Sequence, residues 1–445
     1  MEIFIKIVQF LLSLSLLIVL HEFGHYIAAR IFKTRVEKFY LFFDAWGKKL
    51  FSFKKGDTEY GIGWLPLGGY VKISGMIDES MDKEQMKLPP KPYEFRSKPA
   101  WQRLIIMLGG VTVNFLLGIF IYIMIVNVWG ENYVKSEDVK YGFAVNEIFK
   151  EYGFQDGDKI THINGEEPFD VTDVNKLLFL RNVENIQVTH ADGTTKTIAL
   201  PENIGSIMWE KGLLRPFTER HLATIDSIVP NSIAEKSGFI AGDRVIGVNS
   251  KPVTYWSEFT KKIDSTKAFV KVIRNSDTIT LPVTPEYIKA DKAYQIGVYT
   301  FSLKEALKIN HKEYSFVESI KRGNHLGLTT LKDFISQFKY VFTKKGAGEV
   351  GGFIAIGNIF PATWSWPAFW SITALLSIML GFMNLLPIPA LDGGHALFVL
   401  FEMLTGKKPS DKFLEYAQII GFVLLMGLLL LANGNDIYKL IKGWL

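Results

Sequence analysis

His21, Glu22 and His25 form the pattern H-E-x-x-H near the start of the chain. On a helix, residues four apart lie about one turn apart on the same face, so both imidazoles can reach one metal ion. Glu22 borders that face, where it can take a proton from a water molecule on the metal. The pattern is short and arises by chance in roughly one chain in a hundred of this length. Whether the pattern marks a functional site must therefore be judged from the residues around it.

The motif lies inside an apolar run over residues 3–32. Ionisable side chains in such a run are costly unless they are paired or bind a metal, and they indicate a functional site. Buried histidines that donate to backbone carbonyls are the alternative interpretation. We predict a zinc site with His21 and His25 as ligands and Glu22 as the general base.

A catalytic zinc ion usually has three protein ligands and one open position, so a third ligand is needed. Asp392 is the candidate, because it lies in the segment 384–395, an apolar run with two prolines and two glycines. We expect the prolines to end a helix before Asp392 and the glycines to permit a tight turn. Asp392 could also cap the resumed helix, which is compatible with metal binding through its other oxygen. His395 is expected to project from that helix in a supporting or packing role.

Four apolar runs approach or exceed the approximately 20 residues that a helix needs to cross a bilayer: 3–32, 104–128, 369–400 and 416–432. The first run is too long for a signal peptide, and a basic start and a cleavage site are missing. The third run is interrupted near Asp392, and irregular backbone at membrane depth is tolerated only where it is buried in protein or lines a wet cavity. We expect four transmembrane helices.

The composition agrees with membrane segments joined to soluble insertions, since 48% of the 445 residues are hydrophobic and 21% are charged. The absence of cysteine excludes disulfides, thiolate metal ligands and a cysteine nucleophile. The net charge is only +5, and the basic residues form no stripe with interleaved aromatics, which argues against nucleic acid as a partner. Basic residues next to the spans predict cytoplasmic segments at 34–100 and 405–413, with both termini and 130–365 on the opposite side.

The long segment between the second and third spans contains a repeat. The pattern at 153–160 (G-F-x-x-G-D) recurs 85 residues later at 238–245, each time as a turn before a β-branched strand. The repeat resembles a pair of bacterial PDZ domains, covering 131–215 and 216–288. PDZ domains bind extended peptide ends by adding a strand to a sheet. Spacer domains that bind no peptide are the alternative. Residues 313–342 predict an amphipathic helix.

These features together resemble the site-2 protease family of intramembrane zinc metalloproteases, in its RseP-type bacterial branch, over nearly the whole chain. The resemblance rests on H-E-x-x-H in the first span, N-x-x-P-x-P-x-L-D-G-G from Asn384 in a later span, and the PDZ pair between them. Residues 66–72, entered through 63–65, match the family stretch P-L-G-G-Y-V-K, a membrane-dipping β-hairpin whose edge is thought to accept an unwound substrate strand. An ordinary hairpin packed on lipid headgroups is the alternative.

The resemblance implies one zinc ion per chain, with Asp392 as the third ligand. It further implies that Asn384 helps to hold the substrate backbone, together with Gly68, Gly69 and Tyr70 of the hairpin.

The chain departs from the family pattern at two positions. The family element G-P-x-x-N-F corresponds to residues 110–115, where Val111 replaces the proline, so the local kink is expected to differ. A second family asparagine is replaced by Met379, so that part of substrate binding must differ or be dispensable.

The implied function is intramembrane zinc metalloendopeptidase activity in the bacterial inner membrane. It would perform regulated intramembrane proteolysis of single-pass membrane proteins, namely anti-sigma factors after a first cleavage, or remnant signal peptides. Further expected partners are the lipid bilayer and peptide C-termini at the PDZ domains, which would lie on the extracytoplasmic side. A catalytically inactive PDZ-bearing scaffold and a metal transporter are the alternatives. The intact Glu22 argues against the scaffold, and the cores of the second and fourth spans lack the ionisable residues expected of a transporter.

The expected fold is a multi-pass α-helical membrane protein with four transmembrane helices, a membrane-associated β-hairpin or sheet and two inserted mixed α/β PDZ domains. The expected order is a first transmembrane helix (1–33), a cytoplasmic loop with the hairpin (34–100), a second transmembrane helix (101–130), the PDZ domains (131–215 and 216–288), an amphipathic helical linker (289–365), a third, broken transmembrane segment (366–404) and a fourth transmembrane helix (405–445).

Overall fold

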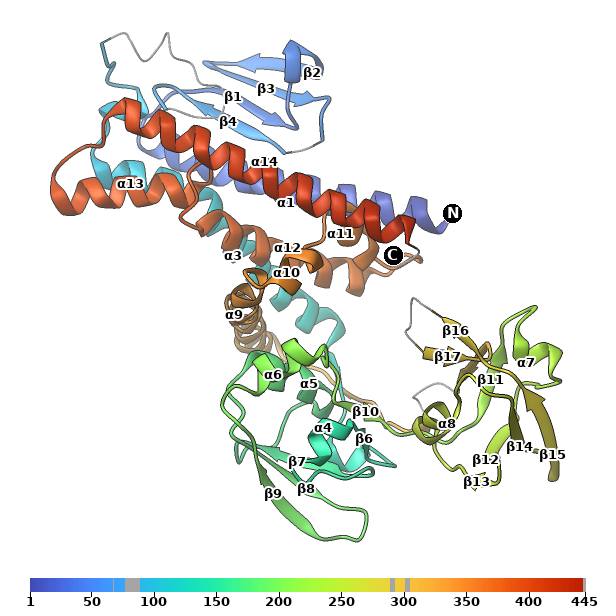
Figure 1. The fold of residues 1–445 in the computed structure, drawn as a ribbon. Helices are drawn as coiled ribbons and strands as arrows, with labels where there is room; N and C mark the ends of the chain where they lie inside the picture. Colours follow the sequence, from blue (N-terminus) through green and yellow to red (C-terminus); the bar gives the residue numbers. More distant parts are fainter. Residues whose placement is uncertain (67, 77–88, 289–292, 301–304, 443–445) are drawn as a thin grey trace. The chain divides into compact units, whose positions relative to one another are not determined.

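The computed structural model of the chain describes residues 1–66, 68–76, 89–288, 293–300 and 305–442. The chain divides into two compact units (Figure 1). We call Met1–Gly130 together with Glu313–Leu445 the helical unit, and Glu131–Lys312 the inserted unit.

The helical unit contains eight helices among the described residues: α1 (Glu2–Ile31), α3 (Ala100–Trp129), α9 (Phe316–Val341), α10 (Lys344–Glu349), α11 (Phe353–Ile359), α12 (Trp366–Leu385), α13 (Asp392–Thr405) and α14 (Asp411–Ile441). Four segments are long and apolar enough to cross a membrane, namely α1, α3, α12 and Lys412–Ile441 of α14. They correspond to the four predicted spans, although the fourth is longer than the apolar run suggested.

Helices α1 and α3 approach each other so closely that glycine is required on both sides. A Cβ atom added to Gly24 would lie 2.3 Å from the carbonyl oxygen of Gly109, and one added to Gly109 would lie 2.5 Å from the carbonyl oxygen of Gly24. Small residues permit such backbone contact between membrane helices, where van der Waals packing stabilises the pair. The helix with the H-E-x-x-H pattern is therefore held directly against α3.

The predicted break in the third span lies between α12 and α13. Leu386 is extended (ψ 143°), as expected for a residue that precedes a proline, and Ala390 has a positive φ of 82°. The expected tight turn at Gly393 and Gly394 is wrong, because both residues belong to α13. A Cβ atom at Gly393 would lie 2.3 Å from the carbonyl oxygen of Leu385. The glycines are thus needed for close packing of the first turn of α13 against the end of α12 and the connecting segment.

Asp392 is the first residue of α13, whereas Leu391 occupies the N-cap position and makes no capping hydrogen bond through its side chain. The capping role considered for Asp392 is therefore wrong. Its carboxylate is left available for other contacts.

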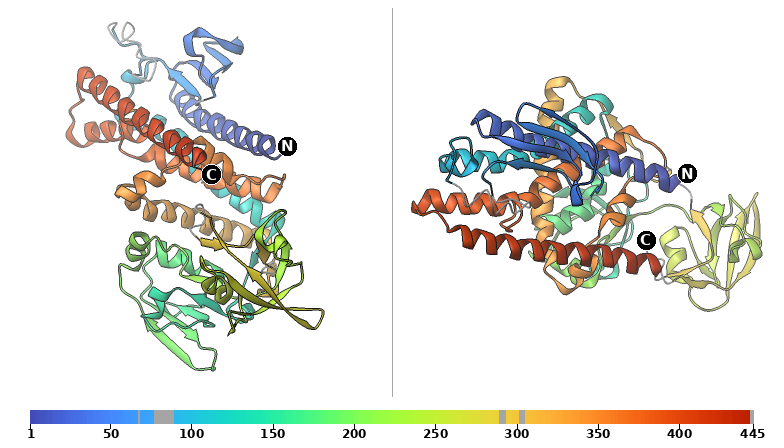
Figure 2. Two further views of the ribbon diagram at one scale, coloured as in Figure 1. Left: turned by 45° about the vertical axis from the view of Figure 1, so that its right-hand side comes forward. Right: turned by 90° about the horizontal axis from the view of Figure 1, so that it is seen from above.

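A four-stranded sheet follows α1, with strands β1 (Val36–Leu41), β2 (Lys49–Lys55), β3 (Thr58–Gly63) and β4 (Tyr70–Ile73) in the order β2-β3-β1-β4. Figures 1 and 2 show it at the end of the helical unit where α1 leads into β1. Among the described residues, β3 and β4 both pair with β1 instead of with each other, so 63–72 connects two strands of a sheet and the predicted hairpin is not confirmed. Leu67, in the predicted hairpin, lies outside the described residues.

Helix α9 confirms the predicted amphipathic helix and begins with a capping box formed by Ser315 and Glu318. It packs on α3 through two glycines, since Cβ atoms at Gly323 and Gly327 would lie within 2.6 Å of Ile123 and Ile119 respectively.

The inserted unit contains two small cores with related element orders. The first is built from β5 (Glu131–Tyr133), β6 (Phe143–Val145), α4 (Glu147–Lys150), β7 (Lys159–Ile163), α5 (Val174–Leu180), β8 (Asn185–Thr189), β9 (Thr195–Ala199), α6 (Ile204–Lys211) and β10 (Phe217–Glu219). The second comprises β11 (Ile225–Ile228), α7 (Ile233–Lys236), β12 (Arg244–Val248), β13 (Lys251–Pro252), α8 (Trp256–Lys262), β14 (Ala268–Arg274), β15 (Asp277–Val283), β16 (Glu286–Ile288), β17 (Ala293–Gln295) and β18 (Val298–Thr300). Strand β19 (Asn310–Lys312) returns to pair with β5.

The observed domain limits differ from the predicted ones, because a strand near the start of each copy pairs with a strand at its end. Strand β10 pairs with β6 and places Phe217 in the first core, past the predicted boundary at 215. Strand β18 pairs with β11, and Ile296 lies in the second core, past the predicted boundary at 288. The segment 289–312, expected in a helical linker, contains strands β17, β18 and β19 among its described residues.

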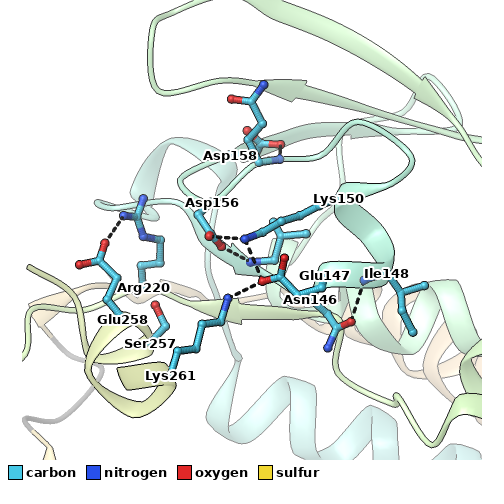
Figure 3. A network of polar contacts seen from close by, with 12 residues as sticks. Asn146, Glu147, Ile148, Lys150, Asp156, Asp158, Arg220, Ser257, Glu258 and Lys261 are labelled. Carbon is cyan, nitrogen blue, oxygen red and sulfur yellow. Dashed lines mark hydrogen bonds and ion pairs between the residues drawn. The ribbon is translucent and has the colours of Figure 1, made fainter. Parts of the chain in front are cut away.

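Polar contacts connect the two copies within the inserted unit (Figure 3). Lys261 of α8 donates to Glu147 of α4 at 2.8 Å, and Glu258 lies 3.7 Å from Arg220. The Arg220 guanidinium also lies 3.6 Å from the centre of the Tyr255 ring. These contacts link α8 and the residue before it, in the second copy, to α4 of the first copy and to Arg220, which lies between the copies.

Candidate metal centre

His21 and His25 are both buried, and their Nε2 atoms lie 3.3 Å apart on one face of α1. Oδ2 of Asp392, at the start of α13, lies 3.2 Å from each of these two nitrogens. Among the described residues this is the one group of three or more His, Cys, Asp or Glu side chains whose potential ligand atoms meet in this way. The structure therefore brings together the three predicted ligands from chain positions more than 360 residues apart.

The spacing of these atoms fits a tetrahedral metal site. Zinc binds His nitrogen and carboxylate oxygen at about 2.0–2.2 Å, so donor atoms at the corners of a tetrahedron lie roughly 3.3–3.5 Å apart. Oδ2 of Asp392 is buried and has no hydrogen-bond donor, although two nitrogens lie close to it. Two ring nitrogens and a carboxylate oxygen that converge in this way are suited to a cation.

Helix α3 contacts both imidazoles. His25 Nδ1 lies 2.8 Å from the carbonyl oxygen of Ile106, and because a carbonyl only accepts, Nδ1 carries the hydrogen and Nε2 has a free lone pair. His21 Nδ1 lies 2.9 Å from the Asn114 side-chain amide. A Cβ atom at Gly110, between these two positions, would lie 2.4 Å from His25 Nε2 and 2.6 Å from His21 Cε1.

Glu22 lies next to the ligands and close to the edge strand of the sheet. The backbone amide of Val71 in β4 faces the Glu22 carboxylate. A Cβ atom at Gly69 would lie 3.5 Å from Glu22 Cγ and 2.5 Å from Ile18, so no larger residue fits there. The outer edge of β4, to which no other described strand is paired, thus lies beside the predicted general base.

The other predicted substrate-binding residues lie around the same centre or support the sheet. Asn384, at the end of α12, has its Nδ2 atom 3.3 Å from His21 Nε2. Gly68 has a positive φ of 156° and packs against the Phe43 ring. The Tyr70 hydroxyl donates to Asp44 at 2.8 Å.

Asp44 anchors Tyr70 as a charged acceptor. Burial raises the pKa of Asp44, but hydrogen bonds from Lys38 and Tyr70 outweigh this effect and hold its pKa below the usual value. The Tyr70 side chain therefore holds β4 in place through its bond to Asp44. Gly69, just before β4, faces α1, the helix that carries the two histidines.

His395, expected outside the ligand set, lines a separate cavity of about 60 Å³ with Met107 and Phe398 among its neighbours. Sequence reasoning assigned no role to Asn114, Gly110, the Ile106 carbonyl or the Val71 amide. Asn114 had a usable signal, because a buried amide in an apolar span needs a polar partner. The two main-chain groups had none, since every residue carries them.

The chain is similar to known proteins over almost its whole length. The family described as Peptidase family M50 matches residues 9–428. The chain is 30% identical to the "Regulator of sigma E protease" of Haemophilus influenzae, with 97% of this chain and 98% of that protein covered. It is 29% identical to the "Regulator of sigma-E protease RseP" of Escherichia coli K12 (97% and 98% covered) and 27% identical to a "Putative zinc metalloprotease" of Neisseria meningitidis (98% and 99% covered).

Proposed function

The chain belongs to peptidase family M50 and is a site-2 type zinc metalloprotease, and from this premise we propose that His21, His25 and Asp392 hold its zinc ion and that Glu22 is its general base. The observation that carries the proposal is the convergence of two Nε2 atoms and the unpaired Asp392 Oδ2 within 3.3 Å of one another.

A zinc ion bound there would supply Lewis acidity, which would polarise a peptide carbonyl and lower the pKa of bound water toward neutrality. Glu22 takes the proton from the attacking water as its oxygen bonds to the carbonyl carbon. Glu22 then passes the proton to the amide nitrogen as the carbon–nitrogen bond breaks. The Val71 amide orients the Glu22 carboxylate for this transfer.

The substrate backbone is proposed to lie along β4. This strand is at the edge of the sheet, and its Val71 amide reaches Glu22, so a peptide added to β4 runs past the general base. Asn384 would hold the same backbone from the other side, because its amide lies beside His21. A peptide bond within a helix is protected by its own hydrogen bonds, so pairing with β4 also keeps the substrate unwound.

The proposed substrates are single-pass membrane proteins, in particular anti-sigma factors after a first cleavage, and remnant signal peptides. Support comes from the names of the relatives, which include regulators of sigma E, and from four helices able to span a membrane. The proposed location is the bacterial inner membrane, with residues 34–100 in the cytoplasm and the inserted unit outside it. One zinc ion per chain is expected.

The two copies in the inserted unit are proposed to be PDZ domains that exclude bulky substrates. Their related strand orders support this assignment. In the first copy Asn175 of α5 pairs with both backbone groups of Phe217, donating to its carbonyl at 2.8 Å and accepting from its amide at 3.0 Å. A peptide strand added to β10 at that position would need the same groups. Peptide binding is therefore assigned to the second copy.

The test is the substitution Glu22→Gln in the full chain. The variant is expected to retain near-stoichiometric zinc and to lose cleavage of a model single-pass substrate by at least about 10³-fold, because the base is absent while the ligands remain. Glu2→Gln, at the exposed start of the same helix, is the matched control and is expected to keep full activity. Cleavage by Glu22→Gln at the wild-type rate would contradict the proposed mechanism.

A further inference from the structure

Helix α3 presents three successive turns to the imidazoles of His21 and His25. The Ile106 carbonyl accepts from His25, Gly110 makes room for both rings, and the Asn114 amide meets His21. The positions are four residues apart and so lie on one face of the helix. One stripe of α3 therefore contacts both histidines.

The two histidines are supported in different ways. The partner of His25 is a carbonyl, which leaves one possible assignment for its hydrogen. The partner of His21 is a carboxamide, which donates through Nδ2 or accepts through Oδ1, and the two orientations differ only by an exchange of nitrogen and oxygen. The orientation of one amide thus decides which His21 nitrogen carries the hydrogen.

Only one orientation is compatible with a metal ligand. With Nδ2 toward His21, Nδ1 must accept, and the hydrogen on Nε2 points toward His25 and Asp392. With Oδ1 toward His21, Nδ1 donates, and the Nε2 lone pair faces Asp392. Asn114 is fully buried and its Oδ1 has no hydrogen-bond partner while Nδ2 faces the ring, so a half-turn of the amide gives Oδ1 a donor.

The backbone at this position is held independently of the side chain. The Asn114 carbonyl accepts a hydrogen bond from Ser377 of α12 at 2.7 Å, and both residues are buried. The amide is therefore placed beside His21 by contact between α3 and α12, not by the histidine itself. A buried amide in an apolar span is costly without a partner, which agrees with a specific role.

We propose that Asn114 is a positioning residue whose side-chain oxygen accepts the His21 Nδ1 hydrogen and selects the tautomer that binds zinc through Nε2. The inference rests on the metal site of the proposed function. Partners of this kind typically contribute 10- to 100-fold to metal affinity.

The test measures zinc affinity of the purified full chain by competition with a chelator. Asn114→Leu keeps a similar size but removes the acceptor, and its affinity is expected to fall about 10- to 100-fold. Asn114→Asp can only accept, so it is expected to bind zinc as tightly as the wild type or more tightly. Thr112→Val is the control, because this threonine is exposed on the same helix and bonds only to Leu108, and it is expected to leave the affinity unchanged.

The Asp variant separates a positioning role from a structural one. If Asn114→Asp lost zinc as Asn114→Leu does, an acceptor oxygen at this position would not be what supports His21, and this result would overturn the proposal. Equal affinity of Asn114→Leu and wild type would also overturn it and leave the metal centre intact. A wild-type chain that binds no zinc would overturn both this proposal and the proposed function. Should the Leu variant fail to fold, the Asp variant decides by its own affinity.

Discussion

At the scale of single residues, Gly110 has little freedom to change. The space that its Cβ would occupy is taken by the imidazoles of His21 and His25, and the nearer contact, 2.4 Å to His25 Nε2, is with a proposed ligand atom. Because α1 and α3 also touch through Gly24 and Gly109, the helices cannot separate to relieve the clash without loss of their packing.

Gly110→Ala is therefore expected to reduce zinc binding at least about 10-fold, since a misplaced ligand weakens the site. The measurement is the zinc content of the purified chain after dialysis against a weak chelator. Gly427→Ala is the control, because a Cβ atom at Gly427 of α14 meets nothing within 4 Å. Full zinc content in Gly110→Ala would show that the imidazoles lie farther from α3 than the structure indicates.

At the scale of elements, side chains complete hydrogen bonding where backbone groups would otherwise be left unpaired. Asn175 of α5 serves the amide and carbonyl of Phe217 in β10, and all of these groups are buried. Strand β10 has its other edge paired with β6. The asparagine therefore occupies the place of a further strand.

Asn175→Ala leaves both Phe217 groups without a partner, and the inserted unit is expected to lose on the order of 2 kcal/mol of stability. Hydrogen exchange of the full chain should show faster exchange around β10. The exposed Asn203 at the start of α6, whose side chain makes no capping hydrogen bond, provides the control through Asn203→Ala. Unchanged protection of the Phe217 amide would count against the proposed closure of this strand.

At the scale of the whole molecule, the orientation of the chain in the membrane is open to a direct test, because the chain contains no cysteine. A cysteine introduced at an exposed position is then a unique label. Lys54 in β2 and Lys196 in β9 are both exposed, and they belong to the helical unit and the inserted unit respectively.

Lys196→Cys is expected to react with an impermeant maleimide added to spheroplasts, whereas Lys54→Cys should react only in inverted vesicles. The physical reason is the basic residues next to the spans, which favour the cytoplasmic side. Labelling of Lys54→Cys in intact spheroplasts would reverse the proposed orientation. Each variant should retain cleavage activity, which shows that the label reports the native arrangement.

The sequence by itself determined the parts that depend on local pattern. The four spans follow from length and hydrophobicity, and the break before Asp392 follows from two prolines. The pairing of His21 with His25 follows from helical periodicity. Each of these features is determined by residues within a few turns of one another, so composition and spacing were sufficient.

Tertiary structure alone decided the rest. Asp392 reaches the histidines because α12 and α13 pack on α3, and Gly393 and Gly394 permit close packing of α13 against the end of α12 and the connecting segment rather than a turn. The sheet order β2-β3-β1-β4 replaced the predicted hairpin, because strand partners are chosen by long-range packing. Strands β10 and β18 lie beyond the predicted domain limits for the same reason, since each pairs with a strand near the start of its copy. The contacts of Asn114 and the Ile106 carbonyl with the histidines arise only where two helices meet. The spacing of residues along the sequence does not show where two helices come into contact.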